Sequence, residues 1–184
     1  SMPPGQLATH TTVSQHTYSI AVCNYNMVDS LAESLESMAE QVDPETFEIV
    51  VVDGGSTDGS RDVLRELAGE YPHLRAVLDR SDECDWLGGD RNISFEESRG
   101  EYVLESMDTD DYYFDGIVDD FLRVFHAVER NREGRFFFSG RGINVARARC
   151  CSMSRTAISA VQRIVTCGDG SAPGTRLSGS TTVK

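Results

Sequence analysis

The feature that most constrains the fold of this chain is an alternation of short apolar runs with segments of helical periodicity. Apolar side chains recur at helical spacing in residues 30–38, 63–71 and 91–98. The run Phe47–Val52 is almost continuously apolar and rich in β-branched residues, which is typical of a parallel strand covered on both faces. The order strand-helix-strand-helix therefore predicts an α/β fold, a three-layer sandwich around a mostly parallel central sheet. The four expected strands are Tyr18–Cys23, Phe47–Val52, Leu74–Leu78 and Glu101–Ser106.

Local signals predict where some of these elements begin and end. Ser30, followed by Glu33 three residues later, has the pattern of a capping box, so the first helix is expected to begin at Ser30. Phe136–Ser139 is expected to form a further strand. A helix before it should bury one face made of Phe114, Ile117, Phe121, Phe125 and Val128.

Three of the expected strands end in polar segments. These segments are Asn24-Tyr25-Asn26, Asp53-Gly54-Gly55-Ser56 and Asp108-Thr109-Asp110-Asp111. Ligands of parallel α/β sheets bind beyond the carboxyl ends of the strands. The three segments are therefore expected to meet at one edge of the sheet and to form the binding site.

The third polar segment has the composition of a divalent-cation site. Alternate side chains of an extended segment share a face, so Asp108 and Asp110 are expected to point to the same place. Clustered carboxylates repel one another unless a cation binds, and Mg²⁺ or Mn²⁺ prefers oxygen ligands. The alternative is a solvated turn whose acidic side chains cap the next helix.

The second polar segment is a glycine-containing turn. Gly55 lets the backbone turn sharply and approach a ligand, and Asp53 could accept a hydrogen bond from a nucleobase or a ribose hydroxyl. The segment lacks the Gly-Lys-Ser/Thr of a P-loop and the G-x-G-x-x-G pattern of nicotinamide-binding turns. The alternative is an ordinary strand-to-helix turn capped by Asp58 or Ser60.

Charge and composition exclude several partners. The net charge is −13, which argues against nucleic-acid binding because phosphates require a basic surface. We expect no transmembrane segment, because no apolar run approaches the roughly 20 residues that a membrane helix needs, and we expect a cytoplasmic location. The five Cys contain no C-x-x-C pair, so we expect neither a disulfide framework nor structural zinc.

The end of the chain differs from the rest in composition. Residues 1–130 contain 28 acidic and 8 basic side chains, whereas residues 131–184 contain 2 acidic and 9 basic ones. A shift of the reading frame would permit Leu-Trp-Arg-Arg-Leu in the tail and would replace the pair Cys150-Cys151 with Leu. We therefore expect residues 1–17 to be disordered, 18–146 to form the folded domain and 147–184 to be an irregular tail, truncated or aberrant through a frameshift. The alternative is a genuine disordered basic tail.

Taken together, these segments resemble the family 2 glycosyltransferases, which are inverting enzymes with the Rossmann-like GT-A fold. The resemblance is carried by YSIAVCNYN, FEIVVVDGGSTDGS, GGDRN, RGEYVLESMDTDD and GINVAR, and it covers about Tyr18 to Arg147. It implies transfer of a sugar from a nucleotide-diphosphate donor, first of all a UDP-sugar, to an acceptor hydroxyl. The acceptor would be a saccharide or a lipid-linked molecule of the kind used for cell-envelope polysaccharides. The protein could then act at the inner face of the membrane or as a homodimer.

The resemblance also implies roles for individual residues. Asp108 and Asp110 match the family's D-x-D motif and would hold Mg²⁺ or Mn²⁺ against the donor pyrophosphate. Tyr25 would flank the nucleobase, Asp53 would bind base or ribose, and Arg91 would lie near the diphosphate. The expected nucleotide-sugar-binding residues are Asn24, Tyr25, Asp53, Gly55, Arg91, Asp108 and Thr109.

The chain departs from the family pattern at two places. Many members have a second Asp where this chain has Gly54, which affects the prediction of base and donor. The family's catalytic base is an acidic residue of the later, acceptor-binding half, and neither Glu133 nor Asp169 lies in such a motif. Two other functions therefore stay open, a noncatalytic nucleotide-binding remnant and a nucleotidyltransferase.

Overall fold

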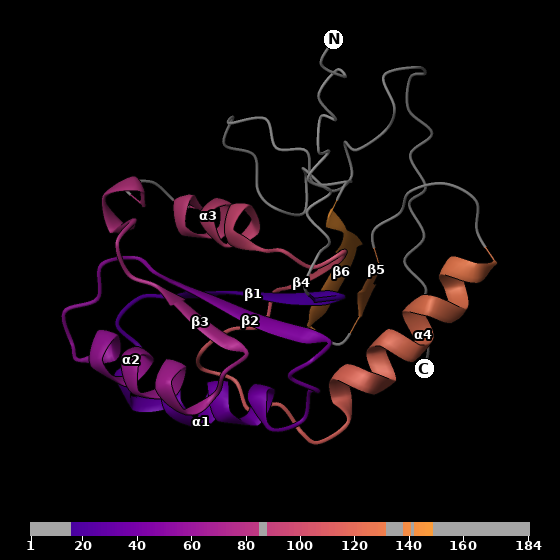
Figure 1. The fold of residues 1–184 in the computed structure, drawn as a ribbon, viewed down its shortest axis with the longest axis horizontal. Helices are drawn as coiled ribbons and strands as arrows, with labels where there is room; N and C mark the ends of the chain where they lie inside the picture. The colour runs from indigo at the N-terminus through magenta and orange to yellow at the C-terminus, as the bar shows by residue number, and fades with distance from the viewer. Residues whose placement is uncertain (1–15, 85–87, 132–137, 141, 149–184) are drawn as a thin grey trace, which may run out of the picture.

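The structure is a computed structural model that describes residues 16–84, 88–131, 138–140 and 142–148. A six-stranded sheet of order β3-β2-β1-β4-β6-β5 forms its centre (Figure 1). The strands are β1 (Tyr18–Asn24), β2 (Phe47–Asp53), β3 (Leu74–Val77), β4 (Tyr102–Glu105), β5 (Phe138–Gly140) and β6 (Ile143–Arg147). The helices are α1 (Val28–Ala39), α2 (Ser60–Glu70), α3 (Gly89–Glu97) and α4 (Ile117–Arg130), with a 3₁₀ turn at Ser81–Glu83.

The predicted mostly parallel sheet is confirmed. Strand β1 pairs in parallel with β2 on one side and with β4 on the other, and β3 pairs in parallel with β2. Strand β6 lies antiparallel to β4, and β5 lies antiparallel to β6. The sequence analysis did not predict β6. Of the predicted strand Phe136–Ser139, the last two residues belong to β5, and residues 136–137 lie outside the described residues.

The two faces of the sheet have cores of unequal size. Helices α1, α2 and α4 pack on one face, where the larger hydrophobic cluster includes Leu35, Leu64 and Phe125. Helix α3 covers the other face, where a smaller cluster joins Val50 and Val52 to Ile93 (Figure 1). All seven residues of β2 are buried, as its continuous apolar pattern predicts. The result is the expected three-layer sandwich.

The predicted capping box at Ser30 is wrong. Helix α1 begins two residues earlier, at Val28, and Met27 at its N-cap makes no side-chain cap. The Val28 amide instead donates to Asp58 Oδ2 at 2.9 Å, so the loop after β2 supplies the acceptor that the helix end requires. This leaves the Ser30 hydroxyl free to donate to the Thr109 carbonyl at 2.8 Å.

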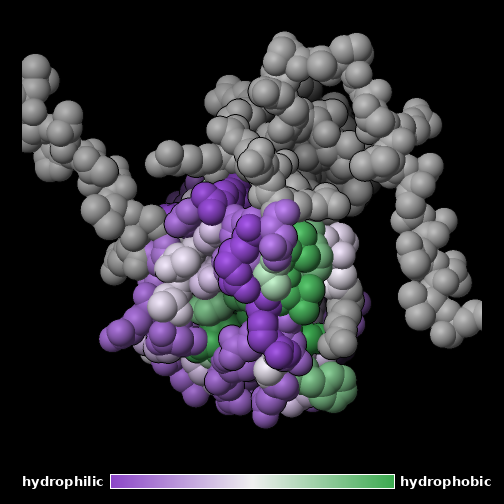
Figure 2. All heavy atoms as spheres, turned by 90° about the vertical axis from the view of Figure 1, so that its right-hand side faces the viewer, coloured by the Kyte–Doolittle hydropathy of each residue, from purple (hydrophilic) through white to green (hydrophobic). Residues whose placement is uncertain are grey.

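The predicted apolar face of the last helix is confirmed in part, because Ile117 and Val128 are only half-buried. Helix α4 begins at Ile117 behind Gly116, whose φ of +81° suits glycine. Phe121 and Phe125 are buried, whereas Phe114 precedes the helix and is 71% exposed. The surface on this side is mostly hydrophilic with a smaller hydrophobic patch (Figure 2). Val124 of α4, which is 50% exposed, is one of the large apolar side chains at the surface.

Both described cysteines, Cys23 and Cys84, are free thiols. No helix among the described residues is long and apolar enough to span a bilayer. Of the predicted disordered segment 1–17 and the predicted irregular tail 147–184, residues 1–15 and 149–184 lie outside the described part of the chain. Arg147, which is predicted to belong to the tail, is the last residue of β6.

Candidate active site

The three polar segments meet at the carboxyl ends of β1, β2 and β4, an edge that we call the carboxyl edge. Asn24 and Asp53 are direct neighbours in the β1–β2 register. Asn24 Nδ2 donates to Asp53 Oδ2 at 3.0 Å, and Thr109 Oγ1 donates to Asn24 Oδ1 at 3.2 Å. Asn24 is 1% exposed and Thr109 3%, so these bonds join the three segments in a buried network. The arrangement follows from the parallel order of the strands, as the sequence predicts.

Asp53 organises the turn that follows β2. Its Oδ1 accepts hydrogen bonds from the Gly55 and Ser56 amides at 3.1 and 2.9 Å, and its Oδ2 accepts one from Ser56 Oγ at 2.6 Å. Gly55 has a φ of +96°, the left-handed conformation that glycine adopts without strain. The Asp53 side chain is fully buried, and the guanidinium of Arg61 lies 3.7 Å from Oδ1. Asp53 therefore fixes the loop, and direct contact with base or ribose stays a prediction.

Tyr25 directly follows β1, lies at the surface beside the turn after β2, and is 58% exposed. A Cβ atom on Gly54 would lie 3.5 Å from Tyr25 Cδ2, so the ring rests against the glycine turn. Asn26 has a φ of 53°, unusual for a residue other than glycine, and its Oδ1 accepts the Thr57 amide at 2.9 Å. The loop is thereby held in a conformation that leaves the Tyr25 ring available to a planar ligand.

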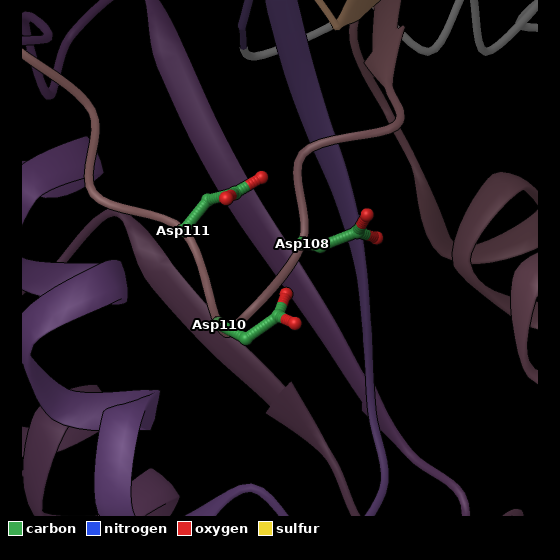
Figure 3. Close-up of side chains that lie close together, drawn as sticks. All are labelled: Asp108, Asp110 and Asp111. Atoms are coloured by element: carbon green, nitrogen blue, oxygen red, sulfur yellow. The ribbon is translucent and has the colours of Figure 1, made fainter.

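The acidic cluster lies on the loop after β4. Carboxylate oxygens of Asp108, Asp110 and Asp111 all lie within 4.8 Å of one another, and all three residues are exposed. Figure 3 shows their side chains on the same side of the loop. Helix α4 begins at Ile117, and its N-cap residue Gly116 makes no side-chain cap, so these acids do not serve as its N-cap. Their hard oxygen atoms suit Mg²⁺ or Mn²⁺. Besides the two predicted ligands, Asp108 and Asp110, the cluster contains Asp111 as a third carboxylate.

The sequence analysis missed a polar stripe on α1 that holds this loop. Ser34 Oγ donates to the Asp108 carbonyl at 2.9 Å, just as Ser30 does to Thr109. Further along the chain, Ser37 Oγ accepts the Tyr113 amide at 3.1 Å, and Gln41, just beyond the end of α1, donates to the Tyr113 carbonyl at 3.1 Å. The signal was present, because polar residues at intervals of four, three and four follow one helical face.

Tyr113 also supports the acidic loop directly. Its hydroxyl accepts the Asp108 amide at 2.6 Å and lies 3.2 Å from the Asp108 carbonyl. Burial raises the pKa of this phenol, and the neighbouring carboxylates of Asp111 and Asp108 raise it as well. Tyr113 therefore stays protonated at neutral pH and can keep donating to the loop.

Arg91 of α3 lies beside the acidic cluster, and its predicted contact with the diphosphate stays a prediction. Its Nη2 lies 4.0 Å from Asp108 Oδ1, and its Nη1 donates to Glu105 Oε2 at 3.2 Å. Beside it, burial raises the pKa of the Cys23 thiol to about 12, so Cys23 stays a neutral thiol at neutral pH. The sequence analysis did not identify Glu105, whose position at the end of an apolar strand was the available signal.

A mostly parallel α/β sheet with an acidic cluster and a glycine turn at its carboxyl edge is an arrangement typical of Rossmann-like nucleotide-binding folds. The sequence model of glycosyl transferase family 2 matches residues 19–134. The chain therefore belongs to glycosyl transferase family 2. This membership favours a glycosyltransferase over a nucleotidyltransferase.

Two poly(ribitol-phosphate) glycosyltransferases are among the similar proteins. The poly(ribitol-phosphate) beta-glucosyltransferase of Bacillus spizizenii is 32% identical over 127 residues, which are 68% of this chain and 19% of that protein. The poly(ribitol-phosphate) beta-N-acetylglucosaminyltransferase TarS of Staphylococcus aureus is 33% identical over 96 residues, 52% of this chain and 16% of TarS. The chain thus spans less than a fifth of the length of either relative.

Solved structures share the GT-A fold. A TarS fragment in complex with UDP-GlcNAc superposes with a TM-score of 0.58 at 22% identity, covering 74% of this chain and 46% of that one. The mannosyltransferase PcManGT of Pyrobaculum calidifontis, in complex with GDP-Man and Mn²⁺, gives a TM-score of 0.58 at 20% identity with the same coverage. The chain therefore has the GT-A fold and belongs to glycosyl transferase family 2.

Proposed function

We propose that this chain binds a nucleotide-diphosphate sugar, first of all a UDP-sugar, and forms the donor half of a metal-assisted, inverting glycosyltransferase. The observation that carries the proposal is the placement of the acidic cluster. Asp108 and Asp110 lie beside Thr109, which is bonded to Asn24 and through it to the Asp53 turn. A single ligand could therefore contact the cation site and both loops.

The donor atoms of the acidic cluster fit a hard divalent cation. Asp108 and Asp110 would hold Mg²⁺ or Mn²⁺, with Asp111 near enough to take part. The bound cation would offset the negative charge of the diphosphate as it leaves. The presence of Mn²⁺ together with GDP-Man in PcManGT supports this assignment.

The other residues of the site would bind and orient the donor. The exposed ring of Tyr25 would stack on the nucleobase. Arg91 has one nitrogen bonded to Glu105 and another near Asp108, and its guanidinium would meet a phosphate oxygen close to the cation. The buried network of Asn24, Asp53 and Thr109 would keep the loops in register during binding.

The acceptor and the stereochemistry follow from the relatives by analogy. TarS is a beta-N-acetylglucosaminyltransferase seen with UDP-GlcNAc, a donor with an α-linked sugar, so a β product corresponds to inversion. We propose a saccharide, a lipid-linked molecule or a cell-envelope polymer as the acceptor, reached from the cytoplasm. Inversion requires a carboxylate that takes the acceptor proton, and we propose that it belongs to the acceptor-binding half, as in the family.

Titration calorimetry with UDP, GDP and TDP, each with Mn²⁺, Mg²⁺ or EDTA, tests the proposal. We expect UDP to bind most tightly, and to bind only when a divalent cation is present. Absence of cation-dependent binding for all three nucleotides would refute it. Cation-dependent binding of UDP combined with no hydrolysis or transfer from UDP-glucose and UDP-GlcNAc would favour the noncatalytic remnant instead.

A further inference from the structure

A buried glutamate lies directly behind the acidic cluster. Glu105, the last residue of β4, is 2% exposed, and its neighbour in the antiparallel register is Asn144 of β6. Asn144 Nδ2 donates to Glu105 Oε1 at 3.1 Å and to Ser106 Oγ at 2.8 Å. A buried carboxylate is costly unless it is hydrogen-bonded and paired with a cation. Glu105 meets this requirement through Asn144 on one oxygen and Arg91 on the other.

The chain bends sharply just after this glutamate. Ser106 has a φ of 63°, a left-handed conformation that is uncommon for a residue other than glycine. The Ser106 hydroxyl accepts the same amide group that holds Glu105. Asn144 thus fixes both the carboxylate and the bend from which the acidic loop starts, and β6 contributes to the site although its sequence carries no metal ligand or nucleotide motif.

Glu105 also limits where the Arg91 guanidinium can go. Nη1 is bonded to Glu105 Oε2 at 3.2 Å, and Nη2 stays 4.0 Å from Asp108 Oδ1. Three exposed carboxylates attract a guanidinium, which prefers close bidentate pairing with a carboxylate. Without Glu105, Arg91 would be free to close on Asp108 and to occupy the oxygen atoms that a cation needs.

We propose that Glu105, held by Asn144, is a positioning residue that anchors Arg91 so that it faces the donor diphosphate without competing for Asp108. The inference rests on the proposed function and adds to it a residue pair that controls cation affinity. Glu105 touches neither cation nor donor in this proposal and acts only through Arg91.

The test is a suppressor experiment with Mn²⁺ alone as the probe, measured by calorimetry or by electron paramagnetic resonance. We expect Glu105→Gln to lower the Mn²⁺ affinity about tenfold, the lower range for a residue that supports a metal ligand. The double variant Glu105→Gln/Arg91→Gln removes the guanidinium that the first substitution releases. Its Mn²⁺ affinity should return to within about twofold of wild type. UDP affinity should stay low in the double variant, because the phosphate contact of Arg91 is lost.

Glu48 offers a matched control. It is also a buried strand glutamate, 4% exposed, with an arginine nitrogen of Arg75 3.9 Å away, but it lies near the amino ends of the strands. Glu48→Gln should lower the free energy of unfolding as Glu105→Gln does and leave Mn²⁺ and UDP affinity unchanged. If Glu105→Gln does not fold, Asn144→Ala is tested in its place. It should lower the Mn²⁺ affinity by less than about tenfold, and the added substitution Arg91→Gln should again restore that affinity.

The outcomes separate this inference from the proposed function. Wild-type protein that binds neither Mn²⁺ nor UDP would overturn the proposed function, and this inference with it. Wild-type binding with unchanged Mn²⁺ affinity in Glu105→Gln, or with a loss that Arg91→Gln does not relieve, would overturn the positioning role alone.

Discussion

The two edges of the sheet both gather polar side chains, and they use them differently. At the amino edge, where β1, β2 and β4 begin, Tyr18 stacks on Phe47 and Tyr102 with ring centroids 4.7 and 5.6 Å apart. Polar groups there bond to one another: the Tyr18 hydroxyl lies 2.7 Å from His126 Nε2, and Glu48 accepts the Ser19 hydroxyl at 2.6 Å. At the carboxyl edge the buried network of Asn24 and Asp53 is equally closed, but the acids above it are exposed.

This contrast separates groups that hold the fold together from groups that await a ligand. Buried polar groups stabilise a structure only when their partners are present, as they are for Tyr18 and Ser19 at the amino edge. Exposed carboxylates held close together repel one another and gain from a bound cation. Changes at the amino edge should therefore affect folding, and changes among the exposed groups of the carboxyl edge should affect binding.

The largest effect is expected at the amino edge, for Gly100→Ala. A Cβ atom there would lie 2.6 Å from the Ser19 amide nitrogen and 2.7 Å from the Tyr18 carbonyl carbon, both backbone atoms. The clash should lower the free energy of unfolding by about 3 kcal/mol, measured by urea denaturation. Gly69→Ala in α2 is the control, because nothing lies within 4 Å of the place that its methyl group would take, and it should gain up to about 1 kcal/mol. A stable Gly100→Ala protein would contradict the assignment of this edge to folding.

At the carboxyl edge, Asp110→Asn should weaken Mn²⁺-dependent UDP binding by about 100-fold, equivalent to about 2.7 kcal/mol. The free energy of unfolding should not fall, because the change relieves repulsion within the acidic cluster. Calorimetry and urea denaturation measure the two quantities. Asp120→Asn on α4 is the control, since this acid is also exposed and pairs with Arg123 across one helical turn. Equal UDP affinity in Asp110→Asn and wild type would show that no cation needed for UDP binding is held by this cluster.

A smaller loss of binding is expected for Tyr25→Ala. Loss of one base-stacking contact costs about 1–3 kcal/mol, so UDP affinity should fall about tenfold. Stability should change little, because the side chain is 58% exposed. Tyr112→Ala is the control, since Tyr112 is 53% exposed and its ring packs on Phe114 rather than on the glycine turn. Tyr25→Phe should keep the affinity, and an equal loss in Tyr112→Ala would mean that Tyr25 has no special role.

The sequence predicted the carboxyl edge better than the contacts beneath it. Hydrophobic periodicity gave the strands and helices, and parallel topology then required their polar ends to meet near Asn24, Asp53 and Asp108. The side-chain partners could not be predicted, because they join residues far apart in the chain, such as Ser34 with the Asp108 carbonyl. The antiparallel strand β6 was missed for a similar reason, since a five-residue strand has little periodicity and its pairing with β4 is set by tertiary packing.

The smallest effect is a pH dependence of stability at the amino edge, and it should come from His73. This residue precedes β3 and is 7% exposed; its Nε2 lies 3.2 Å from the Ala39 carbonyl. Its buried Nδ1 has no hydrogen-bond partner among the described residues. Burial lowers the pKa of His73 from its usual 6.5, although the bond to Ala39 opposes this shift.

The sign of the pH effect follows from this shift. A folded-state pKa below the unfolded one means that the unfolded chain takes up the proton first as the pH falls through 6.5. Stability is therefore complete above that pH and is lost below it, by at most about 1.4 kcal/mol per pH unit for one proton. His73→Gln keeps a donor for the Ala39 carbonyl but cannot titrate, so its urea-denaturation profile should be flatter between pH 6.5 and about 5. The lower limit avoids carboxylates such as Glu97, whose pKa Arg75 holds below its usual value. A wild-type profile as flat as that of His73→Gln would contradict the prediction and show that the folded amino edge accommodates the imidazolium. UDP affinity should be unchanged in His73→Gln, because the amino edge does not take part in donor binding.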